Sequence, residues 1–369
     1  MKKPKSKLLK VFLAFCRILM PEKYFDDIYI PKLLVSKNLK GLGLRKKIWC
    51  FIHGFLPYEY VWYNLPANDH KNYVPARNSY KKRVLDRVFN SILGNKILFE
   101  KHIKSVIEGI DKLHVVESIG YIERGYLYSF HRDIMQGDFS SLLPLLGKND
   151  LILKPVVSDG GVGIFMIRKE EDHFILQDKK MSWSDLVDSL KEFNNYLIQE
   201  RFRQKGFSND IYSGSLNTMR IATMIDPETH KAFISYAAHR FGSEESGFLD
   251  NINQGGLASL IDLENGTLGE GIKFSLIGEK FTYMSHTGSS CKIINKQIPE
   301  WISVKKRLTE MAERMPYLKY VGWDIILSDD ELFVLEGNVS PGLGLIQAFR
   351  PMTDYPAAWK FFKYYKYVT

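Results

Sequence analysis

Three side chains with metal-binding oxygens lie close together near the C-terminal end of the chain. Asp324, Glu336 and Asn338 fall within residues 321–345, VGWDIILSDDELFVLEGNVSPGLGL. Two apolar runs flank the polar residues 328–331, and this pattern predicts two paired strands. Oxygen donors of this kind suit Mg²⁺, which binds one or two carboxylates together with water and substrate phosphates. The stretch predicts a β-hairpin with a magnesium site; a surface hairpin with solvated acidic side chains is the alternative.

The geometry of that site depends on the turn of the hairpin. Glu336 and Asn338 are two residues apart and therefore share one face of a strand. A three-residue turn at 329–331 sets Asp324 opposite Glu336, whereas a two-residue turn sets it opposite Leu335. We expect Asp324 and Glu336 to share a face only if the turn has three residues or a β-bulge intervenes.

The composition is that of a globular protein. The chain has 369 residues, enough for two or three domains, and 45% of them are hydrophobic. The three cysteines, Cys16, Cys50 and Cys291, are far apart, and no His/Cys spacing indicates a zinc site or a disulfide framework. We therefore expect a reducing compartment, the cytoplasm.

Basic residues are concentrated in the first part of the chain. Residues 1–90 hold 19 Lys and Arg against 6 Asp and Glu, a net charge of +13, and the remainder carries −4. This asymmetry indicates an anionic partner for the N-terminal region, such as a membrane surface or a polyanionic substrate. An ordinary basic surface is the alternative. No nucleic-acid partner is expected.

The first twenty residues, MKKPKSKLLKVFLAFCRILM, predict an amphipathic helix over 5–20. Lys10 and Arg17 interrupt the apolar run and no small-residue cleavage site follows, which argues against a signal peptide. The run is also too short to span a bilayer. Such a helix suits peripheral contact with the inner face of a membrane, or packing against its own domain. Further helices are expected near 43–55 and 79–89.

Two lysines and a glycine-rich turn form a second group of candidate residues. A helix expected over 88–107 carries Lys96, and a short strand at 151–154 ends in Lys154. The run SDGGVG, residues 158–163, follows and leads into another strand. In this arrangement bare backbone N–H groups can close over phosphates, because glycine permits a close approach. A plain tight hairpin is the alternative.

Polar side chains in otherwise apolar strands form a third group. Gln199 and Glu200 lie in such a strand, where a buried carboxylate needs a partner such as an adenine amine, a ribose hydroxyl or a lysine. Arg220 and Arg240 can stabilise a transferring phosphoryl group, although an interface or surface ion pair is commoner. His286 is a candidate for proton transfer, with a structural histidine as the alternative.

Taken in order, these residues resemble the ATP-grasp superfamily, specifically its sugar-transfer-associated branch, over about residues 90–350. The segment LEGNVSPG at 335–342 is similar to the LEANTSPG type segment of D-alanine–D-alanine ligases. NTMRI, DNINQGG and HTG resemble segments of the sugar-transfer branch. The implied fold is α+β, with two α/β subdomains that clasp ATP and a mainly helical basic N-terminal region.

The resemblance implies a role for each group. Lys96, Lys154 and Ser158 would contact ATP phosphates. Gln199 and Glu200 would lie at the adenine and the hinge. The three hairpin ligands would hold two Mg²⁺ ions, and the two arginines would be catalytic. The other implied residues are Gly160, Gly161 and Gly163 for ATP, and Asn217, Asn251, Gly255, Gly256, His286, Ser340 and Gly342 for the substrates.

Two positions depart from the family pattern. Gly322 stands where the D-alanine ligases have an arginine, two residues before the metal aspartate. Phosphate stabilisation would then fall to Arg220 or Arg240. Thr287 stands where branch members favour proline, which leaves the role of the loop around His286 open.

The first hypothesis is an ADP-forming ligase that joins a carboxylate, of a small molecule or a glycan, to an amine through an acyl phosphate. A kinase acting on a hydroxyl, and a nucleotide-binding scaffold for membrane glycosyltransferases, are the alternatives. The expected organisation is an accessory region at 1–89, a small subdomain at 90–200 and a large subdomain at 201–369.

Overall fold

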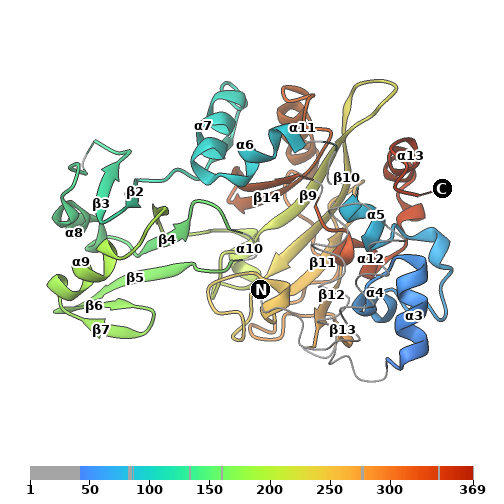
Figure 1. The fold of residues 1–369 in the computed structure, drawn as a ribbon, viewed down its shortest axis with the longest axis horizontal. Helices are drawn as coiled ribbons and strands as arrows, with labels where there is room; N and C mark the ends of the chain where they lie inside the picture. Colours follow the sequence, from blue (N-terminus) through green and yellow to red (C-terminus); the bar gives the residue numbers. More distant parts are fainter. Residues whose placement is uncertain are drawn as a thin grey trace, which may run out of the picture.

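The computed structural model describes residues 42–81, 85, 87–132, 134–158, 161–275, 278–339 and 341–368. Two β-sheets with their helices form a smaller lobe, at the left of Figure 1, and a larger body at the right. The predicted helix 5–20, together with Gly160 and Ser340, lies outside the described residues.

A seven-stranded antiparallel sheet forms the smaller lobe. One face of this sheet packs on α8 (Leu143–Leu146) and α9 (Trp183–Lys191) around a core that includes Leu153 and Leu186. As its sequence indicates, α9 has an acidic first turn: Ser182 caps the helix and forms a capping box with Asp185. The strands, in spatial order, are β3 (Tyr126–Ser129), β2 (Gly120–Glu123), β8 (Tyr196–Glu200), β4 (Leu151–Pro155), β5 (Phe165–Glu170), β6 (His173–Leu176) and β7 (Lys179–Met181).

An eight-stranded sheet forms the larger body. Its neighbouring strands are antiparallel except for the parallel pair at one edge, β1 with β15. The strands, in spatial order, are β1 (Leu113–Val115), β15 (Glu331–Val339), β14 (Tyr320–Ser328), β9 (Met219–Ile225), β10 (Ala232–Phe241), β11 (Leu257–Ile261), β12 (Leu268–Phe274) and β13 (Lys280–Tyr283).

Both faces of the larger sheet are covered. On one face Trp323 and Ile325 of β14 belong to a core that includes residues of α7 (Lys96–Val106) and α11 (Trp301–Glu313). On the other face Tyr320 packs with residues of α12 (Gly344–Phe349) and α13 (Pro356–Tyr364). Since successive side chains of a strand alternate between faces, Asp324 lies on the same face as Tyr320, beyond the cover of α12 and α13.

The helix expected over 88–107 is interrupted at Asn95. The interruption leaves α6 (Asn90–Gly94) and α7, and the Asn95 side chain accepts hydrogen bonds from the N–H groups of Ile97 and Leu98 at the start of α7. Both helices contact β15, and β1 pairs with β15. Residues 90–115 thus pack on the larger sheet rather than with the smaller lobe, and the division between the sheets falls after β1, not at residue 90.

The described part of the N-terminal region is helical and packs against the larger body. Aromatic residues such as Phe55 and Tyr63 join a core with Ile272 and Phe274 of β12. The helical elements here are α3 (Leu44–His53), α4 (Pro57–Trp62), η2 (His70–Asn72), α5 (Ala76–Lys81) and η3 (Arg87–Phe89). Four short helical elements lie elsewhere in the described chain: η4 (Phe139–Leu142), α10 (Phe207–Ile211), η5 (Ile252–Gln254) and η6 (Met352–Asp354). Across the described residues, no helix combines the length and hydropathy that a membrane span requires.

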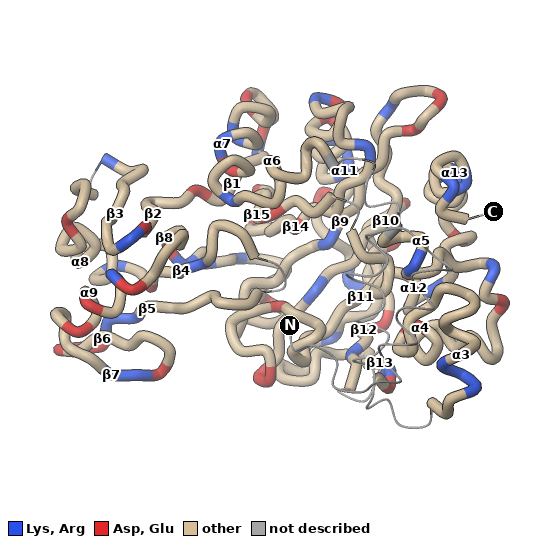
Figure 2. The backbone as a smooth tube through the Cα atoms, in the orientation of Figure 1, with Lys and Arg blue, Asp and Glu red and all other residues tan. Residues whose placement is uncertain are grey.

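Within the described residues, Figure 2 shows lysine and arginine at both ends of the molecule. Figure 2 shows basic segments at the start of α3 and on α13, at one end, and on β7 in the smaller lobe, at the other end. Acidic segments are interspersed with the basic ones along the chain in this view.

Candidate active site

The hairpin β14–β15 brings Asp324 and Glu336 together through a bulge. Its turn has two residues, because Ser328 pairs with Glu331. The register then shifts: Ile325 pairs with Val334, and Asp324 pairs with Glu336, so Leu335 is the extra residue. Of the two ways in which the sequence allowed Asp324 and Glu336 to share a face, a three-residue turn or a β-bulge, the structure has the bulge. The bulge aims two consecutive side chains of β15, Leu335 and Glu336, at the space between the lobes, where both line a cavity.

Asp324 is buried and paired with two arginines. Arg220, its cross-strand neighbour on β9, donates from Nε to Oδ1 at 2.5 Å and from Nη2 to Oδ2 at 3.1 Å. Arg240 Nη2 lies 3.1 Å from Oδ1. Burial alone would raise the pKa of Asp324, but the two guanidinium groups outweigh it and hold this pKa below its usual value. The carboxylate is therefore ionised and held in one orientation.

Arg240 connects this pair to a second buried carboxylate, Asp250. Arg240 Nε lies 3.4 Å from Asp250 Oδ2. Thr218 links the two, since its N–H donates to the same Oδ2 at 2.9 Å and its hydroxyl accepts from Arg240 Nε at 3.1 Å. Burial raises the pKa of Asp250, and Arg240 opposes that rise. Asp250 belongs to a polar turn in the sequence, and nothing in its spacing indicated an ion pair with Arg240.

Asp324, Glu336 and Asn338 present oxygen atoms on one face of the hairpin. Asn338 pairs with Gly322, and the Glu336 side chain is 35% exposed, with Lys96 Nζ 3.5 Å from its Oε1. Among the described residues, no group of three or more acidic, histidine or cysteine side chains could hold a metal ion. These three donors fit Mg²⁺ in type, and its shell would need water or phosphate oxygens to be complete.

Lys96 and Lys154 approach the same space from two different lobes. Lys96 Nζ donates to the backbone oxygen of Ser158 at 3.2 Å and to its hydroxyl at 3.3 Å. Its backbone N–H donates to Val156 O at 3.0 Å, which ties the start of α7 to the glycine loop. Lys154 is buried at the end of β4 and lines the cavity. Burial lowers the pKa of Lys154 to about 8; Glu336 opposes this shift and Lys96 adds to it.

The glycine loop adopts the backbone conformation that glycine allows. Gly161 and Gly163 have φ angles of +74° and +76°. A Cβ atom added at Gly161 would lie 3.1 Å from the Leu249 side chain, which belongs to the larger body. The loop thus reaches across the space between the lobes, and a side chain at this position would meet the opposite wall.

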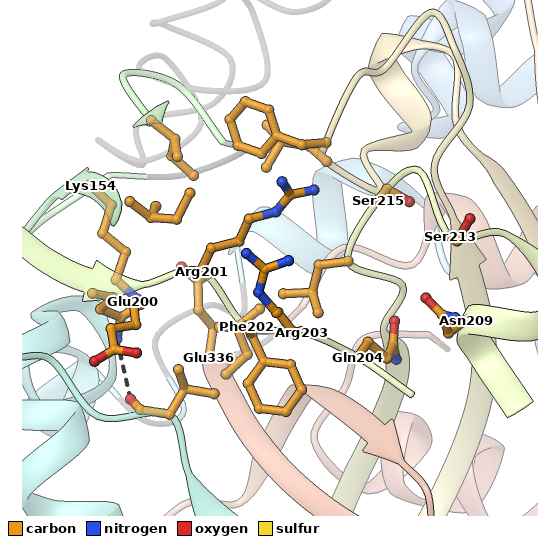
Figure 3. Close-up of a pocket in the computed structure, with 18 residues that line it drawn as sticks. Lys154, Glu200, Arg201, Phe202, Arg203, Gln204, Asn209, Ser213, Ser215 and Glu336 are labelled. Atoms are coloured by element: carbon orange, nitrogen blue, oxygen red, sulfur yellow. Dashed lines mark hydrogen bonds between the residues drawn. The ribbon is translucent and has the colours of Figure 1, made fainter. Parts of the chain in front are cut away.

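A cavity of about 290 Å³ lies between the lobes. Figure 3 shows Lys154 and Glu200 on one side, Asn209, Ser213 and Ser215 on the other, and the linker residues 201–204 between them. Apolar side chains complete the wall: Val116, Ile152, Ile164, Leu216, Phe248, Leu249 and Leu335. Apolar side chains together with the buried ammonium group of Lys154 and the guanidinium groups of Arg201 and Arg203 suit a ligand with an aromatic part and an anionic part.

A sequence model of the sugar-transfer associated ATP-grasp family matches residues 76–350. The chain belongs to this family. The two lobes are accordingly the two halves of an ATP-grasp fold, and the cavity lies where they meet. No curated protein sequence matches the chain.

Solved structures similar to this ATP-grasp chain include two synthetases and a ligase. They are the ADP complex of N5-carboxyaminoimidazole ribonucleotide synthetase (11% identity, 69% of this chain and 46% of that chain, TM-score 0.38), N5-carboxyaminoimidazole synthetase from Staphylococcus aureus (10%, 68% and 45%, 0.37), and D-alanine–D-alanine ligase from Helicobacter pylori (13%, 73% and 61%, 0.38). The chain spans less than two thirds of each of these proteins. The family assignment rests on the sequence match alone.

Gln199 and Glu200 lie on the wall of the ATP-grasp cavity, and their place at the adenine stays a prediction. Gln199 Nε2 donates to Val116 O and to Ser118 Oγ, both at 3.2 Å, which fixes the side chain against the linker between β1 and β2. The linker after β8 was overlooked: Arg201, which pairs with Asp150 at 2.8 Å, and Arg203 also line the cavity. The run RFR directly after the strand was the available signal.

Two residues expected to bind substrate have structural roles instead. Asn217 is fully buried, donates to Ser208 O at 3.1 Å and Tyr212 O at 2.6 Å, and accepts from the Ser215 hydroxyl and the Gly242 N–H. The amide therefore has no group left for a ligand, and the expectation is corrected.

The expectation that His286 binds substrate or transfers a proton is corrected for the same reason. It is buried and stacks on Tyr212 with ring centroids 4.3 Å apart. Its Nδ1 accepts from the N–H groups of Gly288 and Ser289, so Nε2 carries the proton and donates to Gly242 O at 2.8 Å. Burial lowers the pKa of His286, which keeps the ring neutral in this loop. Both ring nitrogens are used, and proton transfer at substrate is not available to them.

The turn DNINQGG has a backbone role. Asn251 accepts from the N–H of Asn253, Gly255 has a φ angle of +99°, and the Gly256 N–H donates to Asn251 O at 3.1 Å. Neither these three residues nor Gly342 lies on the cavity wall. Their contact with substrate stays a prediction.

The departure at Gly322 has a steric explanation. A Cβ atom added there would lie 2.7 Å from the ring of Pro341 and 3.4 Å from Arg220 Cδ. The segment after β15 crosses directly over Gly322, so no side chain fits. Arg220, from the neighbouring strand, brings a guanidinium group to Asp324 instead.

Proposed function

We propose that this chain is an ADP-forming, ATP-dependent carboxylate–amine ligase. The observation that carries the proposal is the convergence of Lys154 and Glu336, from two different lobes, on one cavity, with Lys96 and the Asp324–Arg220 pair beside it. Anion-binding side chains next to a carboxylate pair of metal-binding type suit the phosphates of a nucleotide.

The reaction would proceed in two steps. An oxygen of the substrate carboxylate attacks the γ-phosphorus of ATP, and the bond from this phosphorus to the β-phosphate oxygen breaks. The products of this step are ADP and an acyl phosphate. The amine nitrogen then attacks the acyl carbon, the C–O bond to phosphate breaks, and the amine proton is lost as phosphate departs. Asp324, Glu336 and Asn338 would hold Mg²⁺, which neutralises phosphate charge when bound.

The chain's own residues would position the reactants and exclude water. Lys154 and Lys96 would bind phosphate oxygens, and Arg220 and Arg240 would stabilise the charge that develops on the transferred group. The glycine loop, whose Gly161 reaches Leu249, would shield the acyl phosphate, which water hydrolyses.

The family description points to a sugar-linked substrate, and we infer a glycan or uronic acid carboxylate with an amino acid or similar amine as acceptor. A carboxylate-bearing sugar would also suit the basic character of residues 1–90. The protein would work in the cytoplasm on a precursor of a surface polysaccharide.

The test is product analysis with purified protein, ATP and pairs of carboxylates and amines. We expect ADP and phosphate in equal amounts, dependent on both substrates, and a hydroxamate when hydroxylamine replaces the amine. AMP and pyrophosphate would exclude the ligase. ADP release without amine consumption, with a product stable to hydroxylamine, would show a kinase, and nucleotide binding without turnover would show a scaffold.

A further inference from the structure

Helix α3 exposes a continuous apolar stripe. Leu44, Ile48 and Ile52 follow one another at intervals of four residues and are 75%, 49% and 61% exposed. Residues four apart lie on one face of a helix, so the three side chains form a single ridge along the ten residues of α3. Single exposed apolar side chains are common, but a ridge that runs the length of a helix marks a contact surface.

The opposite face of α3 is firmly attached to the larger body. Cys50 is fully buried, and Trp49 stacks on His53 and Phe55 with centroid distances of 4.1 and 6.0 Å and meets Tyr60 edge-on. These residues belong to the same core as strand β12. The orientation of α3 is therefore set by packing, and the apolar ridge faces outward as a consequence.

Basic side chains flank the ridge, and the helix has no acidic residue. In the sequence LRKKIWCFIH, Arg45 and Lys47 fall on the two sides of the line through Leu44 and Ile48 at about 100° per residue. Lys46 lies near the Tyr60 ring, 6.0 Å from its centroid. The exposed face of α3 is thus apolar along its centre and cationic at both edges.

We propose that α3 docks this protein on an anionic lipid surface, with the ridge of Leu44, Ile48 and Ile52 at the level of the acyl boundary and Arg45 and Lys47 at the headgroups. An apolar face edged by cations is the pattern of helices that lie in a membrane interface. The centre of a protein–protein interface is, by contrast, depleted of lysine. This proposal does not depend on the reaction that the protein catalyses.

The position of α3 makes the contact compatible with catalysis. The helix lies at the end of the molecule away from the smaller lobe (Figure 1), and the cavity lies between the lobes. Membrane contact through α3 would leave the glycine loop and the cavity wall clear of the bilayer. A lipid-linked substrate could then be held near the surface while the lobes remain free to close.

Vesicle sedimentation of the full chain tests the proposal. We expect the protein to sediment with vesicles that contain phosphatidylglycerol, to do so less as salt is raised, and to remain in solution with pure phosphatidylcholine. The double substitution Ile48→Asp and Ile52→Asp should weaken binding at least about tenfold, because charge is placed on the ridge. Ile302→Asp, at a 67% exposed position on α11, is the matched control and should bind as the native chain does.

A second variant tests whether the basic side chains beside the ridge contribute to binding. Arg45→Gln with Lys47→Gln leaves the ridge intact and should weaken binding to anionic vesicles. Thermal melting shows whether each variant is folded. Undiminished binding by the Ile48/Ile52 variant would overturn the proposal and assign any binding to other residues. Loss of a dimer in that variant, seen by light scattering, would overturn it in favour of a second copy of the chain.

Discussion

Asp324 and Glu336 are neighbours across the hairpin, yet they differ in burial and in the number of cations around them. Asp324 is buried and holds two guanidinium groups, whereas Glu336 is partly exposed and has one ammonium group at 3.5 Å. Removal of the Asp324 charge leaves two guanidinium groups without their carboxylate, whereas Lys96, beside Glu336, keeps its hydrogen bonds to Ser158. Substitution of the two carboxylates should therefore separate activity from stability.

Glu336→Gln should abolish turnover and leave the fold intact. The substitution replaces an oxygen that would bind the metal. Loss of even an outer-shell partner of a metal ligand lowers metal affinity or activity about 10–100-fold. We therefore expect kcat to fall roughly 100-fold or more. The melting temperature should fall less than in Asp324→Asn, because the Glu336 side chain is 35% exposed and its ion pair with Lys96 is longer, at 3.5 Å. Full activity in this variant would exclude the proposed metal site.

Asp324→Asn should lose both activity and stability. The buried guanidinium groups of Arg220 and Arg240 would face a neutral amide, and breaking a buried pair costs about 3–5 kcal/mol. Urea unfolding of the two variants side by side measures the difference. Equal stability of Asp324→Asn and Glu336→Gln would contradict the ionic role assigned to Asp324.

ATP affinity should decrease in alkaline solution through Lys154, whose pKa is about 8 because of burial. Below pH 8 the ammonium group is charged and binds phosphate. As the pH rises above 8 the proton is lost, and the dissociation constant should increase by up to about tenfold per pH unit. The charged groups that act on Lys154 are Glu336, Lys96 and Glu100. Calorimetry with a non-hydrolysable ATP analogue between pH 7 and 9.5 provides the measurement.

Lys154→Arg is the control for that experiment, since guanidinium stays charged throughout this range. Its affinity should vary little with pH, although the altered shape would weaken binding at every pH. The same alkaline loss in both proteins would assign the effect to another group.

At the scale of elements, the linker between β8 and α10 joins the lobes through buried polar contacts. Gln204 donates from Nε2 to Asn217 O and to Leu327 O, both at 2.9 Å, and its Oε1 accepts from the Asn217 N–H at 2.9 Å. These bonds hold the linker to β14 and to the segment just before β9 in the larger body. Any movement of the smaller lobe would therefore take place on the β8 side of Gln204.

Asn217→Ala should destabilise the protein without altering substrate affinity. Four hydrogen bonds of a fully buried amide are lost, and each unsatisfied partner costs about 1–3 kcal/mol, so a loss of several kcal/mol is expected. Urea unfolding and KM measurements check the two parts. Asn209→Ala, on the cavity wall, is the contrasting variant, with altered KM and little change in stability.

At the scale of the whole molecule, the larger sheet is buried on both faces and carries buried polar groups away from the cavity. His239 on β10 is one of them: its Nε2 accepts from the Ser208 hydroxyl at 2.8 Å and its Nδ1–H donates to Arg240 O at 3.2 Å. Burial lowers the pKa of His239 to about 3 from the ordinary 6.5. The folded protein therefore contains neutral His239 at all moderate pH values.

This histidine makes the folded state less stable in acid. Between pH 6.5 and about 3 the unfolded chain binds a proton at His239 that the folded chain does not, so stability falls with decreasing pH by up to about 1.4 kcal/mol per unit. His239→Gln should show a shallower fall. Urea unfolding at pH 7, 6 and 5 compares the two, and parallel curves would contradict the assignment; contributions from carboxylates are common to both proteins.

The local pattern of the sequence was sufficient for the metal-site hairpin and for the order of the chemical groups, although not for the interruption of the helix expected over 88–107. Two apolar runs on either side of a polar turn predicted the hairpin, and the acidic first turn of α9 agreed with its capping box at Ser182. Lys96, Lys154, Glu200 and Glu336 were identified from residue type and order, and all four lie at the space between the lobes. Such features depend on neighbours within a few residues, which a sequence displays directly.

Contacts between distant residues were decided by the tertiary structure alone. The bulge at Leu335, which sets Glu336 opposite Asp324, depends on pairing across strands, and the register could be either of two from the sequence. The engagement of Asn217 and His286 by backbone groups, and the packing of Pro341 over Gly322, involve partners far away in the chain. Residue type and spacing determined which groups could do chemistry. Burial and long-range pairing determined which of them are free to do it, because an amide or imidazole whose donors and acceptors are all paired within the protein has none left for a ligand, whereas a carboxylate keeps spare lone pairs.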